Sequence, residues 1–309
     1  MSKTIKQHFV PITYLKHWSL DENRDRNSKV YCCHPDGKVT PVGINVTAFS
    51  NHTYSRNNPN DAEAYFDLFE TDWNTLIQTL ADNNKINCSN FHQKILIQSV
   101  MYSLRNPIYN KVSDIERIEL IRKFNILYLE NVLFNGHCLK NSKEAYEIIN
   151  TLWQCKILKT VSDDLITSDN PTSIFIDSEN DVKAIVLPLT PKYIFIAVKK
   201  VTFTIESDSI KYEDVAHLNL IAAYNANRFI YSSTEYENSS CEIFIKIQQD
   251  KINDSEIGDD YLGSRCLDVT KIFENLSFIN KLKKKEKAQV IPIVVKAKGC
   301  KIFTLKSKN

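Results

Sequence analysis

Glycine is scarce in this sequence, with only six among 309 residues. None belongs to a glycine-rich loop of the kind that binds phosphate at the start of a helix, which argues against a P-loop or dinucleotide-binding protein. Long apolar runs are also missing. No segment is long enough to span a bilayer, and the start, MSKTIKQHFVP, lacks the apolar stretch of a secretory signal. We therefore expect a soluble, cytoplasmic protein that does not enter a membrane.

Closely spaced cysteines are missing too, although the chain has eight cysteines. No C-x-x-C pair occurs, and only Cys32 and Cys33 are adjacent, so the sequence lacks the spacing of a zinc knuckle. Scattered cysteines in a cytoplasmic chain are typically reduced packing residues. We expect none of them to act as a nucleophile.

Charge is unevenly distributed along an otherwise ordinary globular composition of 43% hydrophobic and 25% charged residues. Residues 281–309 contain ten lysines and one acid, a net charge of +9, which leaves −7 on residues 1–280. Such a basic segment attracts nucleic acid or nucleotides, and we expect Lys283, Lys284 and Lys285 to make those contacts. The alternating pattern from residue 290 onward also fits a hairpin whose lysines face solvent or the acidic body.

The order of the predicted elements indicates an α+β fold, because helices and strands are segregated rather than alternating as βαβ units. The first elements are a strand-and-turn segment with a Pro-Asp-Gly hairpin (1–55) and four helices (60–157), one of them near 113–134. The first of these helices has six apolar residues near one stripe: Ala64, Leu68, Trp73, Leu76, Ile77 and Leu80. A β-rich segment follows (157–235), with an antiparallel sheet, a helix at 213–226 and a strand at 228–233, and then a further helix (268–285). We expect a core domain over 1–235 and a C-terminal extension over 236–309.

Several polar residues lie where hydrophobic periodicity does not require them. His8 opens the segment HFVPITYLKHW. It is either a hydrogen-bonded structural residue or, since imidazole titrates near neutrality, a proton shuttle or metal ligand. Arg105 ends an apolar helix just before Pro107, where it either bonds the last carbonyls of the helix or presents its guanidinium to phosphate.

Two glutamates, Glu63 and Glu70, are seven residues apart. This spacing places them on one helical face, about 10 Å apart along the axis. The gap is too wide for both to bind one small ion without bridging ligands, so a catalytic pair needs a third group. Carboxylates placed in this way are otherwise solvated or salt-bridged.

The box Ser168-Asp169-Asn170-Pro171 interrupts a strand-like run. It predicts a turn, because Asp and Asn bond their own backbone and Pro fixes φ. It equally fits a strand end that delivers Asp169 and Asn170 to a site.

Six boxes occur in a fixed order: His-Phe-Val-Pro-x-x-Tyr-Leu-x-x-Trp (8–18), Glu-x6-Glu (63–70), Arg-x-Pro (105–107), Ser-Asp-Asn-Pro (168–171), Pro-Leu-Thr-Pro (188–191) and Leu-Asn (218–219). In this order they resemble the bacterial domain-of-unknown-function family 4238, over residues 8 to about 233. The chain departs from the usual family residues at Phe9, Trp18 and Thr190, where Tyr, Phe and Ser are typical. The family has no established activity, so the resemblance implies only that the boxes belong together.

We therefore expect His8, Glu63, Glu70, Arg105 and Asp169 to converge in one cleft, and we count Asn170 with them as a catalytic residue. Our leading hypothesis is a metal-assisted hydrolase, such as a nuclease effector of bacterial defence, that acts on nucleic acid or a nucleotide. Glu63, Glu70 and Asp169 would hold a divalent Mg or Mn ion or act as general base. His8 would shuttle a proton and Arg105 would bind phosphate. The alternative is a non-catalytic sensor or binding module that recognises a small anion or a partner peptide.

Overall fold

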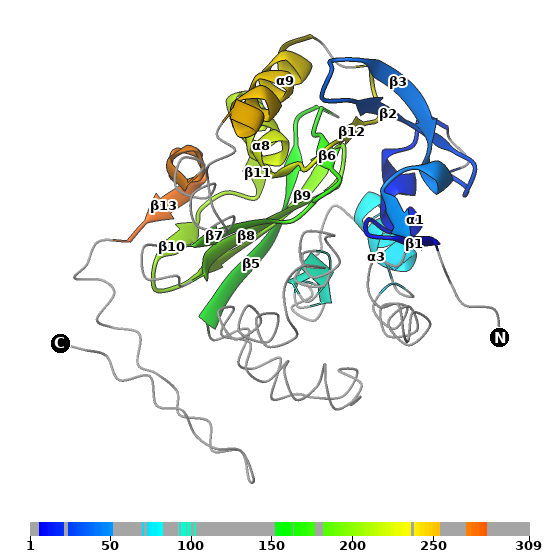
Figure 1. Cartoon of the computed structure of the whole chain (residues 1–309). Coiled ribbons are helices and arrows are strands. Elements are labelled where there is room, and N and C mark those ends of the chain that lie inside the picture. The colour runs from blue at the N-terminus through cyan, green and yellow to red at the C-terminus, as the bar shows by residue number, and fades with distance from the viewer. Residues whose placement is uncertain are drawn as a thin grey trace, which may run out of the picture.

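A computed structural model of the chain is shown in Figure 1. It describes residues 6–21, 24–51, 70, 73–82, 92, 94–96, 98–99, 102, 152–162, 164–176, 182–235, 238–253 and 270–282. Three groups of predicted features therefore lie outside the described residues: the site residues Glu63 and Arg105, the lysines at 283–285 with the hairpin after them, and the helix predicted near 113–134.

The larger sheet has five strands in the order β11-β5-β9-β8-β7. Their bounds are β5 Trp153–Thr160, β7 Ser173–Ile176, β8 Val182–Thr190, β9 Tyr193–Lys199 and β11 Ser209–Ile210. All neighbours are antiparallel except β11 and β5, which are parallel. Strands β8 and β9 are buried along almost their whole length, as expected for central strands that are covered on both faces.

The smaller sheet has four antiparallel strands in the order β3-β2-β12-β6. Their bounds are β2 Lys29–Cys33, β3 Val39–Gly43, β6 Thr167–Ser168 and β12 Ile230–Ser232. Strands β2 and β3 form the predicted hairpin. In its turn Gly37 has a φ of +85°, a left-handed conformation that glycine adopts without steric cost, and the Asp36 carboxylate accepts a hydrogen bond from Lys38 N at 3.0 Å.

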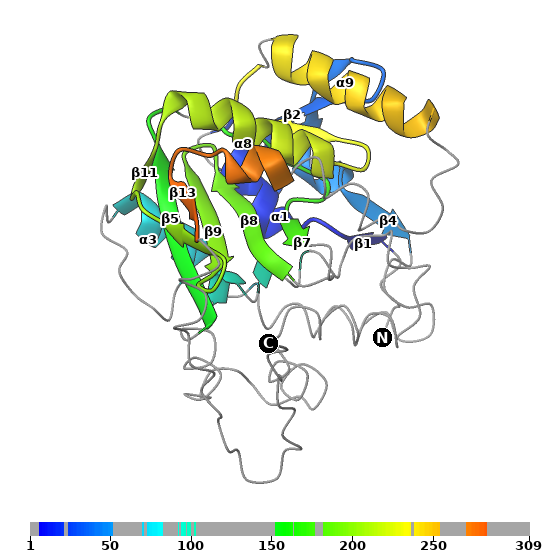
Figure 2. The same cartoon turned by 90° about the vertical axis from the view of Figure 1, so that its left-hand side faces the viewer.

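Helices cover both faces of the larger sheet (Figures 1 and 2). On one face lie the short N-terminal helices and α3; on the other lie α8 and residues 270–282. The bounds are α1 Ile12–Leu15, η1 Lys16–Trp18, η2 Ile44–Val46, α3 Trp73–Asp82, α8 Tyr212–Asn225 and α9 Asn238–Asn253. Two strand pairs complete the fold: β1 Lys6–His8 with β4 Phe49–Asn51, and β10 Phe203–Ile205 with β13 Ile279–Lys281.

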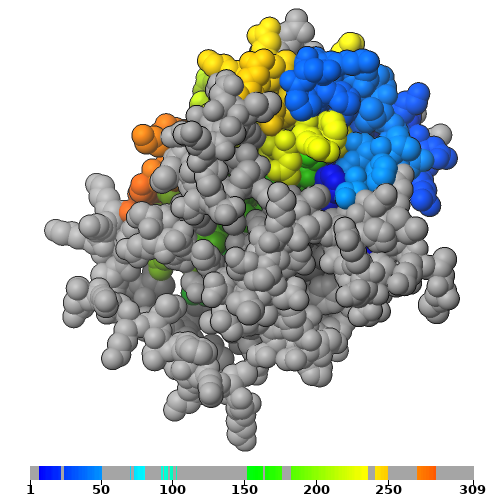
Figure 3. Space-filling model, in the orientation of Figure 1, coloured from blue at the N-terminus to red at the C-terminus, as the bar shows by residue number. Residues whose placement is uncertain are grey.

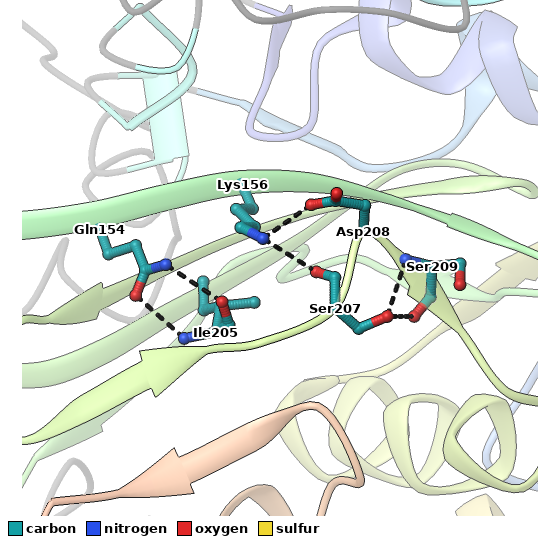
Figure 4. A network of polar contacts seen from close by, with 6 residues as sticks. All are labelled: Gln154, Lys156, Ile205, Ser207, Asp208 and Ser209. Carbon is teal, nitrogen blue, oxygen red and sulfur yellow. Dashed lines mark hydrogen bonds and ion pairs between the residues drawn. The ribbon is translucent and has the colours of Figure 1, made fainter.

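Side chains of β5 fasten the segment that leads from β10 to β11 (Figure 4). The Gln154 amide donates to Ile205 O at 3.1 Å and accepts from Ile205 N at 2.9 Å, so one side chain satisfies the backbone as a neighbouring strand would. The Lys156 ammonium donates to Ser207 O at 3.2 Å and to the Asp208 carboxylate at 2.6 Å. These bonds hold the connection against the edge of the sheet.

Residues 270–282 are part of the main core. Phe273 stacks on Phe175 of β7 with ring centroids 4.5 Å apart. The buried Asp214 carboxylate, in the first turn of α8, accepts hydrogen bonds from Ser277 N at 2.8 Å and from Ser277 Oγ at 2.5 Å. Since β13 also pairs with β10, this segment is held by packing, by a buried carboxylate and by strand pairing.

The predicted α+β class is confirmed, and so are several elements. The predicted helix at 213–226 corresponds to α8, and the predicted strand at 228–233 contains β12. The four apolar residues predicted on one stripe of α3 that the structure describes are all buried: Trp73, Leu76, Ile77 and Leu80. Among the described residues, no helix has both the length and the apolar character to cross a bilayer.

Other boundaries were predicted wrongly. The helical segment does not reach residue 157, because Trp153 to Lys159 pair in register with β9. The helix predicted over 268–285 ends near residue 274. It ends there because Ser277 N donates a hydrogen bond to the Asp214 carboxylate and residues 279–281 pair with β10 as a strand. The sequence pattern did not predict α9, whose buried Cys241, Phe244 and Ile247 recur at helical spacing.

Candidate functional site

The N-terminal box runs from β1 into the short helices α1 and η1. His8, the last residue of β1, is half-buried and pairs with Phe49 of β4; their ring centroids are 5.7 Å apart. The backbone N–H of Phe9 donates to Ala48 O at 3.0 Å, and α1 begins three residues later. This turn directs the chain inward, so that Tyr14 is fully buried.

The Tyr14 hydroxyl joins the N-terminal box to the Pro-Leu-Thr-Pro box and to Thr167, the residue just before the Ser-Asp-Asn-Pro box. It donates to Pro188 O at 2.6 Å and lies 2.6 Å from Thr167 Oγ1. A phenol has one hydrogen, and a carbonyl oxygen only accepts, so Thr167 donates its own hydroxyl hydrogen to Tyr14. Burial raises the pKa of Tyr14 well above its ordinary value, because a phenolate would lose its hydration. The hydroxyl is therefore a neutral structural group.

Aromatic rings enclose this hydroxyl pair. The ring of Tyr14 lies 5.3 Å from Tyr102, 6.0 Å from Trp73 and 6.3 Å from Trp18, between centroids. The contact with Tyr102 is edge-to-face, a favoured geometry for aromatic pairs. The N-terminal box thus packs on α3 and on the segment that contains Tyr102, three residues before Arg105.

The Asp169 carboxylate accepts hydrogen bonds from backbone N–H groups. Its carboxylate is buried and accepts hydrogen bonds from Asn227 N at 2.8 Å and from Arg228 N at 2.9 Å. Its own N–H donates to Phe229 O at 3.0 Å. Asp169 therefore fixes the turn that leads from α8 into β12, and its negative charge is compensated by two backbone dipoles.

Asn170 contributes hydrogen bonds to the same region, at the C-terminal end of α8. Its side-chain amide donates to Asn225 O, the end of α8, at 3.1 Å. In return the Asn225 amide donates to Asn170 O at 2.5 Å and to Thr172 O at 2.7 Å. Ser168 Oγ donates to Asn170 O at 2.8 Å. The box is thus a turn, as one of the two interpretations predicts, and it holds the C-terminal end of α8.

The Leu-Asn box fastens the strand that precedes the turn. Asn219 of α8 accepts a hydrogen bond from Ile166 N at 3.0 Å and donates to Asp164 O at 2.8 Å. Together with Asn170 and Asn225, it ties α8 to the chain on both sides of β6. These amides satisfy backbone groups that no sheet neighbour reaches.

Glu70 is attached to the N-terminal box. Its carboxylate accepts a hydrogen bond from Thr13 Oγ1 of α1 at 3.3 Å, and both side chains are half-buried. Thr13 is five residues from His8, so the structure brings the carboxylate of the second box to the segment that carries the histidine. Glu63 and Arg105, the remaining partners predicted for this site, lie outside the described residues.

The predicted metal ligands are Glu63, Glu70 and Asp169. In the described part of the chain, no three histidine, cysteine, aspartate or glutamate residues are grouped as ligands of one ion. Asp169 already accepts two backbone hydrogen bonds, while Glu70 accepts the hydrogen bond of Thr13 through one carboxylate oxygen. Of the two, Glu70 is the better placed to face solvent and an ion, since it is half-buried and Asp169 is buried.

A protein-family model described as a protein of unknown function (DUF4238) matches residues 6–236. The chain belongs to the DUF4238 family. No curated protein and no solved structure matches the chain. The DUF4238 match covers all the boxes and ends just after β12, whereas α9 and residues 270–282 lie beyond it although the latter pack into the same core.

The residues that join the DUF4238 boxes are Tyr14, Thr167, Asn219 and Asn225. The first three lie in or beside the boxes, but their types alone do not distinguish a packing role from a functional one. Tyr14 carried a signal, since it belongs to the N-terminal box, six residues after His8 and three after Pro11, within an apolar segment. The partners of Asn225 depend on tertiary contacts, and no sequence spacing indicates them.

His17, in the same box, is buried as a neutral imidazole. Burial, together with the nearby charges of Lys16 and Arg24, lowers the pKa of His17 to about 3, although the Asn74 side chain opposes the shift. The folded pKa lies below the ordinary value of 6.5, so protonation favours the unfolded chain.

We predict that Asp169→Asn lowers the free energy of unfolding by about 2 kcal/mol. The substitution replaces one carboxylate oxygen with an NH2 group, which faces a backbone N–H and leaves that donor without an acceptor. Urea denaturation checks this against Asp164→Asn, the same substitution at an exposed position, for which we expect a change within about 0.5 kcal/mol. Equal stability of the two variants would mean that the capping bonds of Asp169 contribute little.

A second prediction concerns the loss of stability at acidic pH. Because the pKa of His17 is lowered to about 3, its contribution to stability is complete above pH 7 and is lost as pH falls from about 6.5 toward 3, by up to about 1.4 kcal/mol per pH unit. The His17→Gln variant lacks this loss. Urea denaturation at pH 7, 6 and 5 should therefore show wild type losing stability faster than His17→Gln as the pH falls.

The control for this experiment is His217→Gln, at an exposed position of α8. Its stability should run parallel to that of wild type over the same pH range. Parallel curves for all three proteins would contradict the burial of a neutral His17.

Proposed function

We propose that this DUF4238 protein is a hydrolase that acts on the phosphodiester of a nucleic acid or a nucleotide, with its reacting groups where the N-terminal box meets the helical segment. The observation that carries the proposal is the hydrogen bond between Thr13 and Glu70. It holds a half-buried carboxylate beside the segment that ends β1 with His8. Histidine and carboxylate side chains are the groups that general acid-base catalysis uses, and His8 and Glu70 are each half-buried.

The roles follow from the chemistry of each group. His8 shuttles a proton to or from the reacting oxygen. Glu70, with Glu63 from the same box, binds a divalent Mg or Mn ion or acts as general base. Arg105 binds a phosphate oxygen through its planar guanidinium. Arg105 follows Tyr102 by three residues in the sequence, and Tyr102 packs against Tyr14 of the N-terminal box.

Asp169 and Asn170 have a positioning role in this proposal. Their polar atoms hold the end of α8 and the turn into β12. The same hydrogen-bonded framework reaches the N-terminal box through Thr167 and Tyr14. The lysines at 283–285 follow directly after β13 and would add positive charge for a polyanionic substrate.

A second candidate is a non-catalytic module that binds a small anion or a peptide. The observation that favours it is that the side chains of Asp169 and Asn170 form hydrogen bonds with backbone groups. Two of the six predicted catalytic residues therefore hold the turn in place and do not contact a substrate. On this reading, His8, Glu70 and Arg105 recognise a ligand without turning it over.

The test measures cleavage of RNA, single-stranded DNA, duplex DNA and nucleotides by the full chain, with Mg²⁺, with Mn²⁺ and with a chelator. We expect His8→Gln and Glu70→Gln each to reduce kcat by about 10²-fold or more while the melting temperature changes little. Glu213→Gln, at an exposed position on α8, serves as the matched control and should retain full activity. Wild-type protein that binds a nucleotide but cleaves no substrate would overturn the hydrolase and favour the binding module.

A further inference from the structure

Two cysteines from distant parts of the chain face each other beneath α9. Cys33 is the last residue of β2, and Cys241 lies in the first turn of α9. Both are buried, and both belong to the small apolar cluster between the four-stranded sheet and helices α8 and α9. The Cys33 thiol donates a hydrogen bond to His34 O at 3.7 Å, and it lies near enough to the Cys241 thiol for each to shift the pKa of the other. We propose that Cys33 and Cys241 are a redox site that forms a disulfide when the protein meets a hydroperoxide.

The strand geometry selects Cys33 over its neighbour Cys32. Successive side chains of a strand point to opposite faces of the sheet. Accordingly Cys32 packs in the main core, whereas Cys33 packs in the cluster that contains Cys241. Cys32 therefore faces away from α9, and the pair is specific although the two cysteines are adjacent.

The contact between α9 and the β2–β3 hairpin is close. A Cβ atom on Gly37, in the hairpin turn, would lie 2.7 Å from Ile245 Cδ1 of α9. Figure 3 shows the hairpin surface adjoining that of α9 and of the segment before it. The hairpin that follows Cys33 and the helix that carries Cys241 are therefore packed against each other.

The surroundings assign different roles to the two thiols. Interaction with the Cys33 thiol lowers the pKa of Cys241, although burial opposes this, and the same interaction and burial raise the pKa of Cys33. The position of Cys241 in the first turn of a helix favours its thiolate further, because the helix dipole is positive there. Cys241 is thus the nucleophile and Cys33 the resolving thiol.

The chemistry balances with the hydroperoxide as the only oxidant. The Cys241 thiolate attacks the peroxide, its sulfur gains the hydroxyl group, and the O–O bond breaks to release, after protonation, an alcohol, or water if the oxidant is hydrogen peroxide. The Cys33 sulfur then attacks the sulfenic acid, its proton leaves with the hydroxyl group as water, and the S–S bond forms. Two thiols are oxidised and one peroxide is reduced.

The bond would fasten a helix outside the DUF4238 match to the domain within it. The match ends at residue 236, before α9. Strand β2, which carries Cys33, pairs with β12, and Ile230 of β12 lies between Cys33 and Ser168. The disulfide therefore acts two strands away from the turn that holds Asp169.

Disulfide mapping of the full chain tests the proposal. Purified reduced protein is treated with hydrogen peroxide or with diamide, free thiols are blocked, and tryptic peptides are analysed without reduction. Trypsin gives one peptide over 30–38, with Cys32 and Cys33, and one over 229–246, with Cys241 as its only cysteine. We expect these two peptides linked within one chain, and a melting temperature about 5 °C above that of the reduced protein.

Four variants identify the bond. The linked peptides should form in Cys32→Ser, be lost in Cys33→Ser and Cys33→Ala, and be unchanged in Cys155→Ser, a control on β5. A link that persists without Cys33, a bond from Cys241 to another cysteine, or oxidised wild-type protein without this link would each overturn the proposal.

Discussion

The hydroxyl of Tyr14 is the interaction on which the arrangement of the boxes depends. A buried hydroxyl is costly unless it is hydrogen-bonded, and this one finds its two partners on separate strands, Thr167 of β6 and Pro188 of β8. The smaller sheet, the larger sheet and the N-terminal helices thus meet at one point. The aromatic rings around it exclude water, which makes the two hydrogen bonds harder to replace.

This constraint explains why polar residues recur in segments that are otherwise apolar. The chain between Asp164 and Thr172 has few sheet partners, so amides and a carboxylate satisfy its backbone and that of the neighbouring turn. Such residues stabilise the fold through their hydrogen bonds to the backbone. Glu70 and His8 are half-buried instead, and this difference in exposure separates the groups that hold the site from those that we propose to react.

Local signals in the sequence were sufficient for part of the fold. The Pro-Asp-Gly turn predicted the β2–β3 hairpin, and the apolar spacing predicted α8 and the buried face of α3. Other features depend on contacts between distant residues. The parallel pairing of β11 and the early end of the last helix at Ser277 both result from such contacts. The sequence also predicted the residues of the Asp169 turn, but a turn and a site use the same residue types, and only the backbone donors at Asn227 and Arg228 distinguish them.

The central claim, that a buried hydroxyl pair joins the boxes, is tested most directly by a double-mutant cycle of Tyr14→Phe and Thr167→Val. Free energies of unfolding are measured by urea denaturation for wild type, both single variants and the double variant. Because the two hydroxyls bond each other, the account predicts a coupling energy of about 1 kcal/mol or more. Effects that add to within about 0.3 kcal/mol would contradict it.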